Sequence, residues 1–147
     1  FDIAMRKAVR QAERSDNTFS LLLFDIDHFK SINDQHGHDT GDIILKRLAT
    51  LVGQTLRSTD LLARWGGEEF AILLQDTTAQ GASIFAERLR QQVAETRLHG
   101  LAVTISLGIA EYRRGDDPEA ILARADSALY RAKRSGRNRV GIADTQE

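Results

Sequence analysis

Residues 61–74 read LLARWGGEEFAILL, two short apolar runs joined by the pair Gly66-Gly67. A glycine pair between two such runs is typical of a tight β-hairpin, because glycine readily adopts the positive φ angles that the turn needs. Leu61–Trp65 and Phe70–Leu74 are therefore the two expected strands of a hairpin.

Upstream of this hairpin the sequence predicts a helix, a strand and a second helix. Apolar residues recur at helical spacing from Phe1 to Ala12, which predicts a helix that ends near Ser15. Leu21–Phe24 is a continuous apolar run that Asp25 stops, as in a strand covered on both faces. The second helix is expected over about residues 40–57.

Downstream of the hairpin the sequence predicts a helix over residues 78–95 and a half-buried strand in which apolar residues alternate from Val103 to Ile109. The dipeptide Asp117-Pro118 is typical of a helix start, and Ser135-Gly136 of its end. Residues 139–142 are expected to add an edge strand.

This order of elements is βαββαβ with additional N-terminal and C-terminal helices. Strand-helix-strand connections in one sheet are right-handed crossovers between parallel strands, and a tight hairpin reverses the chain. The expected fold is therefore mixed α/β (α+β), a ferredoxin-like or palm-type antiparallel sheet. In that topology Asp25 and the hairpin tip, residues 66–68, lie at the same edge of the sheet.

Composition limits the classes of function. The chain has 147 residues, which suits a single domain, and 41% of them are hydrophobic. It has no cysteine, so disulfides and thiolate chemistry are excluded, and a reducing compartment is consistent. A formal net charge of −1 predicts no nucleic-acid partner and no membrane contact by this domain, and no apolar run is long enough to span a membrane.

The residues at the expected edge are acidic: Asp25, Glu68 and Glu69. Clustered carboxylates repel one another unless a cation lies between them, and Mg²⁺ beside a phosphate is the usual occupant of such a site. The glycine tip would let a polyanion approach closely. The alternative is an ordinary strand end followed by an ordinary turn.

Two further groups of polar residues allow two interpretations each. Lys133, Arg134 and Arg137 either complement the dipole at the end of the last helix or bind terminal phosphates. Between the first strand and the next helix lie four residues that are either turn and cap residues or part of a purine site: Lys30, Asn33, His38 and Asp42.

Residues 66–70 read GGEEF, and the flanking segments DIDHFKSIND (25–34), GHDTGD (37–42), SLGIA (106–110) and ALYRAKRSGRNRV (128–140) accompany it. In order and spacing the chain resembles the catalytic GGDEF domain of a diguanylate cyclase, and the resemblance covers nearly all of residues 1–147. The family's short Leu-Thr-Gly-Leu and Asn-Arg stretch before the first helix is not in the chain. An upstream sensory domain is also expected to lie outside it.

The resemblance implies a role for each site residue. Asp25, the carbonyl of Ile26 and Glu68 are the expected metal ligands. Glu68 and Glu69 are the candidates for deprotonating the 3′-hydroxyl, and Lys30 is expected to stabilise charge in the transition state. The expected GTP-binding residues are Asn33, His38, Asp42, Gly67, Lys133 and Arg137.

By the same resemblance the chain is expected to be a nucleotidyltransferase that condenses two GTP molecules into cyclic di-GMP and two pyrophosphates, as a two-fold homodimer. Two Mg²⁺ per active site are implied, with Mn²⁺ as a substitute. The expected location is cytoplasmic, and membrane anchoring of a longer protein through upstream segments is left open. The alternatives are a degenerate GTP-binding domain, a cyclic di-GMP receptor, or cyclase- or polymerase-like chemistry on another nucleotide.

An inhibitory site for cyclic di-GMP is implied as well. Arg57 and Asp60 form an Arg-x-x-Asp motif five residues before the glycine pair, and Arg88 matches a further arginine of that site. On chemistry alone these residues would form an exposed ion pair. The resemblance favours product binding.

Overall fold

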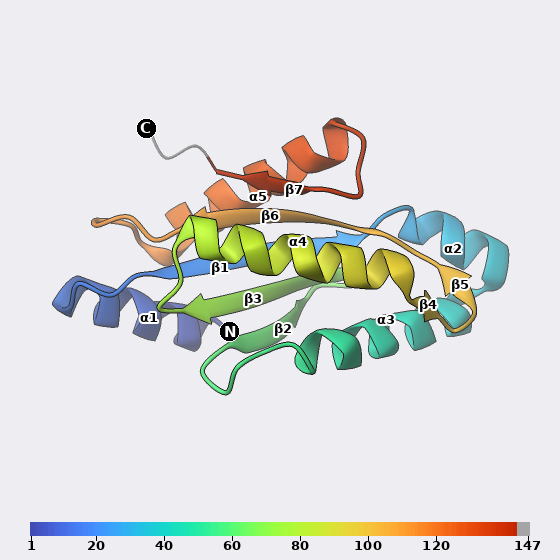
Figure 1. The fold of residues 1–147 in the computed structure, drawn as a ribbon, viewed down its shortest axis with the longest axis horizontal. Helices are drawn as coiled ribbons and strands as arrows, with labels where there is room; N and C mark the ends of the chain where they lie inside the picture. The colour runs from blue at the N-terminus through green and yellow to red at the C-terminus, as the bar shows by residue number, and fades with distance from the viewer. Residues whose placement is uncertain (144–147) are drawn as a thin grey trace.

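The computed structural model of the protein describes residues 1–143. A five-stranded sheet carries the helices, and a separate two-stranded hairpin lies beside it (Figure 1). In chain order the elements are α1 (Asp2–Arg14), β1 (Phe19–Ile26), α2 (Phe29–His36), α3 (His38–Gly53), β2 (Leu61–Trp65), β3 (Glu69–Gln75), α4 (Ala79–Glu95), β4 (Arg97–Leu98), β5 (Leu101–Ala102), β6 (Ile105–Glu111), α5 (Pro118–Arg134) and β7 (Val140–Ile142).

The strand order in the large sheet is β2-β3-β1-β6-β7. Strand β1 is central and runs antiparallel to both of its neighbours, β3 and β6, while β2 is antiparallel to β3. The predicted βαββαβ topology is therefore confirmed, with β1 and β3 as central neighbours. The expected last edge strand is also present, because β7 pairs in parallel with β6.

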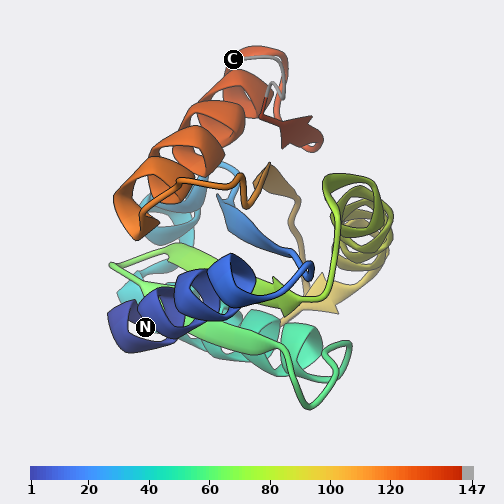
Figure 2. The same ribbon diagram turned by 90° about the vertical axis from the view of Figure 1, so that its left-hand side faces the viewer.

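Helices cover both faces of the sheet, which is why β1 is buried along its whole length (Figure 2). On one face Leu22 and Phe24 of β1 pack into a core with α3 and α4. On the other face Leu21 and Leu23 pack into a second core with α1 and α5. Alternate side chains of one strand point to opposite faces, so each core receives every second residue.

Helix α5 lies unusually close to the sheet because two strand positions carry no side chain. A Cβ atom added to Gly108 of β6 would lie 2.3 Å from the backbone nitrogen of Leu129 and 2.4 Å from the carbonyl oxygen of Ala125. A Cβ added to Gly141 of β7 would lie 2.3 Å from the carbonyl oxygen of Ala128. The backbone of α5 therefore packs directly on the backbone of two strands.

Three expectations need correction. Residues 29–36 form the helix α2, which the sequence interpretation left as polar connection because its only buried residue is Phe29. Helix α3 ends at Gly53 and does not continue to Arg57. Strand β6 is buried on both faces from residue 105 to residue 110, since α4 and α5 cover it from opposite sides, so it is not half-buried.

The hairpin of β4 and β5 was not predicted either. Its turn consists of His99 and Gly100, whose φ angles are +52° and +79°. Positive φ at both central residues is the requirement of a two-residue hairpin turn of this hand. Within residues 1–143 no helix has the length and apolar character needed to span a membrane.

The packing of α5 gives a stability prediction. Alanine at Gly108 would place a methyl group inside the backbone of α5, so Gly108→Ala should lower the free energy of unfolding by about 3 kcal/mol. Urea denaturation measures this change. The matched control is Gly53→Ala, because a Cβ at Gly53 meets no atom within 4 Å and should change stability by less than about 1 kcal/mol. Equal stability of the Gly108→Ala variant and the parent would contradict the close packing.

Candidate active site

Three acidic residues meet at the carboxyl end of β1. Asp25 lies opposite Glu69 of β3 in the antiparallel register, and Glu68 directly precedes β3. The hairpin turn between β2 and β3 contains Gly66, whose φ of +80° suits glycine. The predicted meeting of the strand end and the hairpin tip is thus confirmed.

Asp25 is buried, with 3% of its surface exposed, and this burial dominates its electrostatics. Desolvation raises the pKa of Asp25 from 3.8 to about 6, and the charges of Glu68 and Glu69 act in the same direction. The hydrogen bond and the positive charge of Lys133 oppose the rise. Lys133 of α5 is the ion-pair partner of Asp25, through Nζ and Oδ2.

The other carboxylate oxygen of Asp25, Oδ1, is a candidate metal ligand. Oδ1 is buried and has no hydrogen-bond partner in the described part of the chain. A buried anionic oxygen without a donor is costly unless a cation or donor is bound there. No group of three or more histidine, aspartate or glutamate side chains within residues 1–143 could hold a metal by itself. Two carboxylates completed by other oxygens suit Mg²⁺, so the donor set of Asp25 and Glu68 fits this ion.

A cleft of about 270 Å³ opens beside these carboxylates. Six of the residues predicted for the site line it: Asp25, Ile26, Lys30, Glu68, Lys133 and Arg137. Among these six, two acidic and three basic side chains come together from β1, α2, the hairpin turn, the end of α5 and the segment that follows it. Such a surface can hold a polyanion together with the cation that neutralises it.

The other predicted residues lie outside the lining of this cleft. Glu69 is half-buried in β3, and the carbonyl of Gly67 accepts a hydrogen bond of 3.0 Å from Nε of Arg64. His38 and Asp42 are exposed on α3. Their roles stay predictions.

Asn33 of α2 packs against α3 where α3 has a glycine. Its Oδ1 is buried without a hydrogen-bond partner among the described residues, and a Cβ at Gly41 would lie 1.9 Å from it. Gly41 thus makes room for the Asn33 amide, next to Asp42 in the chain. An unsatisfied amide oxygen near an exposed carboxylate is suited to accept hydrogen bonds from a base.

The sequence interpretation missed a role for Asp27. This residue is 6% exposed and lines the same cleft. Its carboxylate accepts hydrogen bonds from Thr104, Ser106 and the backbone of Asn138. The available signal was a second acidic residue two positions after Asp25, directly after a strand that is mostly apolar.

The Arg-x-x-Asp motif is held at the opposite end of the sheet, before β2 begins. Arg57 donates to the Asp60 carboxylate through its backbone nitrogen at 2.9 Å and through Nη2 at 3.0 Å. Nη2 of Arg57 also donates to the carbonyl of Gln75 at 2.8 Å. The side chain of Asp60 is 3% exposed, whereas that of Arg57 is 56% exposed. Arg88 is exposed on α4, and no described residue joins it to this pair.

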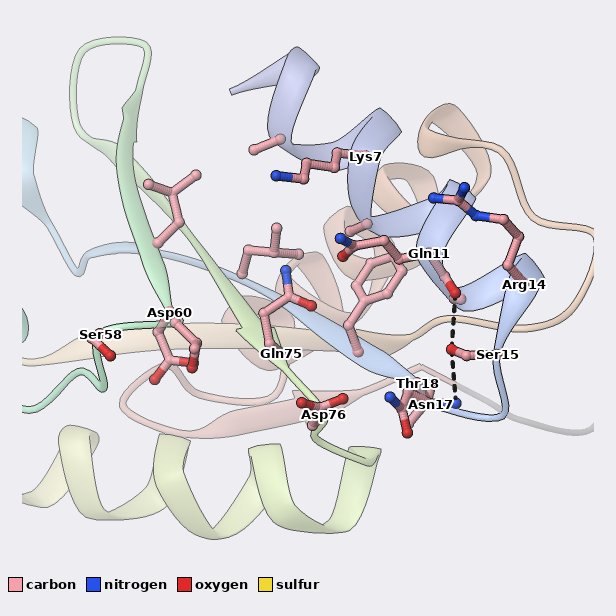
Figure 3. Close-up of a pocket in the computed structure, with 17 residues that line it drawn as sticks. Lys7, Gln11, Arg14, Ser15, Asn17, Thr18, Ser58, Asp60, Gln75 and Asp76 are labelled. Atoms are coloured by element: carbon pink, nitrogen blue, oxygen red, sulfur yellow. Dashed lines mark hydrogen bonds between the residues drawn. The ribbon is translucent and has the colours of Figure 1, made fainter.

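A larger hollow of about 740 Å³ lies on the α1 side of Asp60. Figure 3 shows Lys7 and Gln11 of α1 on one side of it and Asp60 and Gln75 on the other. It contains none of the residues of the cleft at Asp25. This larger hollow and the acidic cleft are therefore separate features.

The burial of Asp25 gives a prediction for the metal-free protein. A carboxyl group whose folded pKa exceeds its unfolded value destabilises the fold, and this loss grows as the pH rises from about 4 to about 6. In EDTA at pH 7, Asp25→Asn should raise the thermal unfolding temperature. The corresponding gain in the free energy of unfolding should be at most about 3 kcal/mol. The gain should vanish near pH 4. Asp34→Asn, at an exposed position of α2, is the control, and a less stable Asp25→Asn variant at pH 7 would refute the prediction.

Comparison with known proteins adds a family to this geometry. The family model described as "Diguanylate cyclase, GGDEF domain" matches residues 1–139. Diguanylate cyclase A of Treponema denticola is 40% identical over 139 residues, which cover 91% of this chain and 38% of that protein. The chain thus spans well under half the length of this relative.

Solved structures agree with the sequence match. The active GGEEF domain of a diguanylate cyclase from Vibrio cholerae is 39% identical, with a TM-score of 0.92 over 98% of this chain and 94% of that one. The GGDEF domain of DgcB from Caulobacter crescentus, solved in complex with c-di-GMP, is 37% identical, with a TM-score of 0.91 over 97% of this chain and 87% of that one. The chain belongs to the GGDEF domain family of diguanylate cyclases.

Proposed function

We propose that this domain condenses two GTP molecules into cyclic di-GMP and two pyrophosphates. The observation that carries the proposal is the cleft in which Asp25, with one unpaired carboxylate oxygen, and Glu68 lie among Lys30, Lys133 and Arg137. Acidic residues able to hold a cation, beside basic residues able to hold phosphates, are the requirement of phosphoryl transfer. Family membership supports the choice of a guanine nucleotide.

In this proposal Asp25 and Glu68 hold Mg²⁺, together with the carbonyl of Ile26. Two bound Mg²⁺, or Mn²⁺ as a substitute, would make the attacking hydroxyl easier to deprotonate and neutralise the charge on the leaving pyrophosphate. Asp25 is paired with Lys133 in the ligand-free protein. We expect Lys133 to leave this carboxylate for the phosphates when a cation takes its place.

The chain's own residues would then act on the substrate. Lys133 and Arg137 bind the terminal phosphate, the tip at Gly67 lies against the phosphates, and Lys30 stabilises the charge that develops on the α-phosphate. Glu68, or Glu69 beside it, accepts the proton of the 3′-hydroxyl. The 3′-oxygen forms a bond to the α-phosphorus of the other GTP as the bond to pyrophosphate breaks, and a second such step closes the ring.

The guanine base would bind at Asn33, His38 and Asp42. A carboxylate at Asp42 accepts from N1–H and from the exocyclic amine of guanine, whereas adenine presents an acceptor nitrogen at N1. The buried Oδ1 of Asn33, which has no partner among the described residues, supports a ligand at this position. The space that Gly41 leaves for this amide supports the same pocket.

Assembly follows from the symmetry of the product. Cyclic di-GMP is two-fold symmetric, while one chain offers one cleft and one set of phosphate ligands. Two chains would each present one GTP to the other, as a homodimer. GTP as substrate favours a cytoplasmic location for the domain.

We further propose product inhibition through Arg57, Asp60 and Arg88. Arginine can donate two hydrogen bonds to O6 and N7 of guanine, and aspartate can accept from its N1–H and amine. Asp60 is already oriented by Arg57, and most of the Arg57 side chain stays exposed. The c-di-GMP complex of the DgcB domain is consistent with a product site in this family.

Turnover tests the proposed function. With GTP and Mg²⁺, the parent should form cyclic di-GMP, and Glu68→Gln should lower the rate by about 100-fold or more because it removes a metal ligand and a candidate base. Asp34→Asn should keep the parental rate. Product chromatography measures both reactions. A folded Glu68→Gln variant with near-parental activity would contradict the assignment, and absence of any product from the parent, with Mg²⁺ present, over a range of protein concentrations would contradict the function.

Inhibition is tested separately. Arg88→Ala and Arg57→Ala should each relieve inhibition by added cyclic di-GMP and leave the initial rate unchanged, and inhibition of the parent should be non-competitive with GTP. Arg88→Ala is the cleaner variant, because Arg57 also supports Asp60 and Gln75. Arg47→Ala, at an exposed position of α3, is the control. Competitive inhibition, or variants inhibited as strongly as the parent, would leave the motif an ion pair only.

A further inference from the structure

Asp27 connects the end of β1 to two distant segments of the chain. Its Oδ1 accepts a hydrogen bond of 2.6 Å from Ser106 Oγ, and its Oδ2 accepts one of 2.7 Å from Thr104 Oγ1 and one of 2.9 Å from the backbone nitrogen of Asn138. Its own backbone nitrogen donates to the carbonyl of Thr104 at 2.9 Å. Both carboxylate oxygens thus have hydrogen-bond partners, whereas Oδ1 of Asp25 has none among the described residues.

The segment that Asp27 holds has a backbone that side chains rarely adopt. Arg137 and Asn138 follow α5 with φ angles of +62° and +48°, and Gly136 before them has +128°. Two consecutive residues with Cβ atoms in the left-handed region cost energy, so contacts with the surroundings must maintain this conformation. The segment lies between α5 and β7, at one end of the sheet (Figure 1).

The contacts of Asn138 hold the left-handed backbone conformation of this segment in place. Its backbone nitrogen donates to Asp27 and, at 3.1 Å, to Ser106 Oγ. Its side-chain Oδ1 accepts a hydrogen bond of 2.8 Å from Nη1 of Arg90 on α4, and Glu87 fixes Arg90 at 2.6 Å. Asn138 is therefore held at once by the residue that follows β1, by β6 and by α4.

Arg137 depends on this arrangement for its direction. It lines the cleft with Asp25 and Lys133, yet its side chain is exposed and makes no hydrogen bond or ion pair with the described residues. Only its backbone is fixed. Its nitrogen donates to the carbonyl of Ala132 at 3.1 Å, and the next residue, Asn138, is held by its hydrogen bonds with Asp27, Ser106 and Arg90, which together are called the clamp. The backbone therefore fixes where the side chain of Arg137 begins, and with it the region that the guanidinium can reach.

We propose that Asp27 and Asn138 are positioning residues, which hold the left-handed segment so that Arg137 points at the phosphates of the substrate. This inference rests on the proposed function of the cleft. Asp27 acts through Arg137 and takes no part in metal binding, since hydrogen bonds occupy both of its oxygens. Arg90 ties the same segment to α4, the helix that carries Arg88.

The first test is a double-mutant cycle on nucleotide affinity. Asp27→Ala and Arg137→Ala should each raise the KM for GTP by about tenfold or more, the usual effect of losing a hydrogen bond to a charged group. The doubly substituted protein should be no worse than the poorer single variant, because both changes remove one interaction. Asp27→Asn should recover most of the affinity, since its amide oxygen can still accept from the Asn138 backbone.

The matched control is Ser20→Ala. Ser20 is also buried on β1, and its Oγ donates at 2.9 Å to the carbonyl of Thr77, at the opposite end of the strand. This variant should lose stability with no change in the KM for GTP. If Asp27→Ala fails to fold, Asn138→Ala replaces it, because Asn138 is exposed and the change removes both its side-chain bond to Arg90 and the tolerance of asparagine for the left-handed region. Additive effects in the cycle would overturn the proposal.

The second test does not depend on turnover. Hydrogen exchange of the backbone amide of residue 138, followed by NMR, should be slow in the parent and in Ser20→Ala, and should accelerate in Asp27→Ala or, more weakly, in Asn138→Ala. If the parent neither binds nor converts GTP while the amide is protected, the proposed function fails and the clamp stands. An Asn138 amide that exchanges equally in the parent and in Asp27→Ala would overturn the clamp.

Discussion

The backbone contact between α5 and strands β6 and β7 is the constraint on which the cleft depends. Glycines at positions 108 and 141 let the helix approach until its carbonyl oxygens lie where strand side chains would be. At that separation Lys133 reaches Asp25, and the chain that follows α5 reaches Asp27. A helix kept away by even one methyl group would carry Lys133, and with it the following Arg137, away from the carboxylates, so a packing requirement in the core decides the electrostatics at the edge.

Two aspartates at this end of the sheet, Asp25 and Asp27, have opposite hydrogen-bonding environments. Asp27 has hydrogen-bond donors on both oxygens and joins segments of the fold, whereas Asp25 has one oxygen in an ion pair and one with no partner in the described region. Buried polar groups are usually satisfied, and exceptions concentrate where a ligand completes them. Asp27 is therefore a structural residue of the site, whereas Asp25 keeps an oxygen available for a ligand.

Much of the fold could be predicted from residue patterns. The Gly66-Gly67 hairpin, the apolar run of β1 and the Asp117-Pro118 helix start each carry a strong local signal, and topology then placed Asp25 beside Glu68 and Glu69. Helix α2 was missed because eight largely polar residues bury only Phe29, and the hairpin at His99 was missed because its strands are two residues long.

Parts of the site depend on contacts that local patterns do not contain. The pairing of Lys133 with Asp25 and the clamp on Asn138 join residues that are far apart in sequence, and only the packed structure decides which basic residue meets which acidic one. The predicted base-binding residues illustrate the reverse case. Their identity came from the family resemblance, and the structure adds only that Asn33 is buried against Gly41 with an unpartnered oxygen.

The long separation between the two halves of the cleft has a consequence for synthesis. A ribosome delivers β1 early, but its neighbours β3 and β6 come later, and α5 with the segment after it comes almost last. Until α5 has emerged, a nascent chain has Asp25 and Glu68 without Lys133 and Arg137, although Lys30 is already present. A chain that stops before α5 would therefore carry only one half of the cleft.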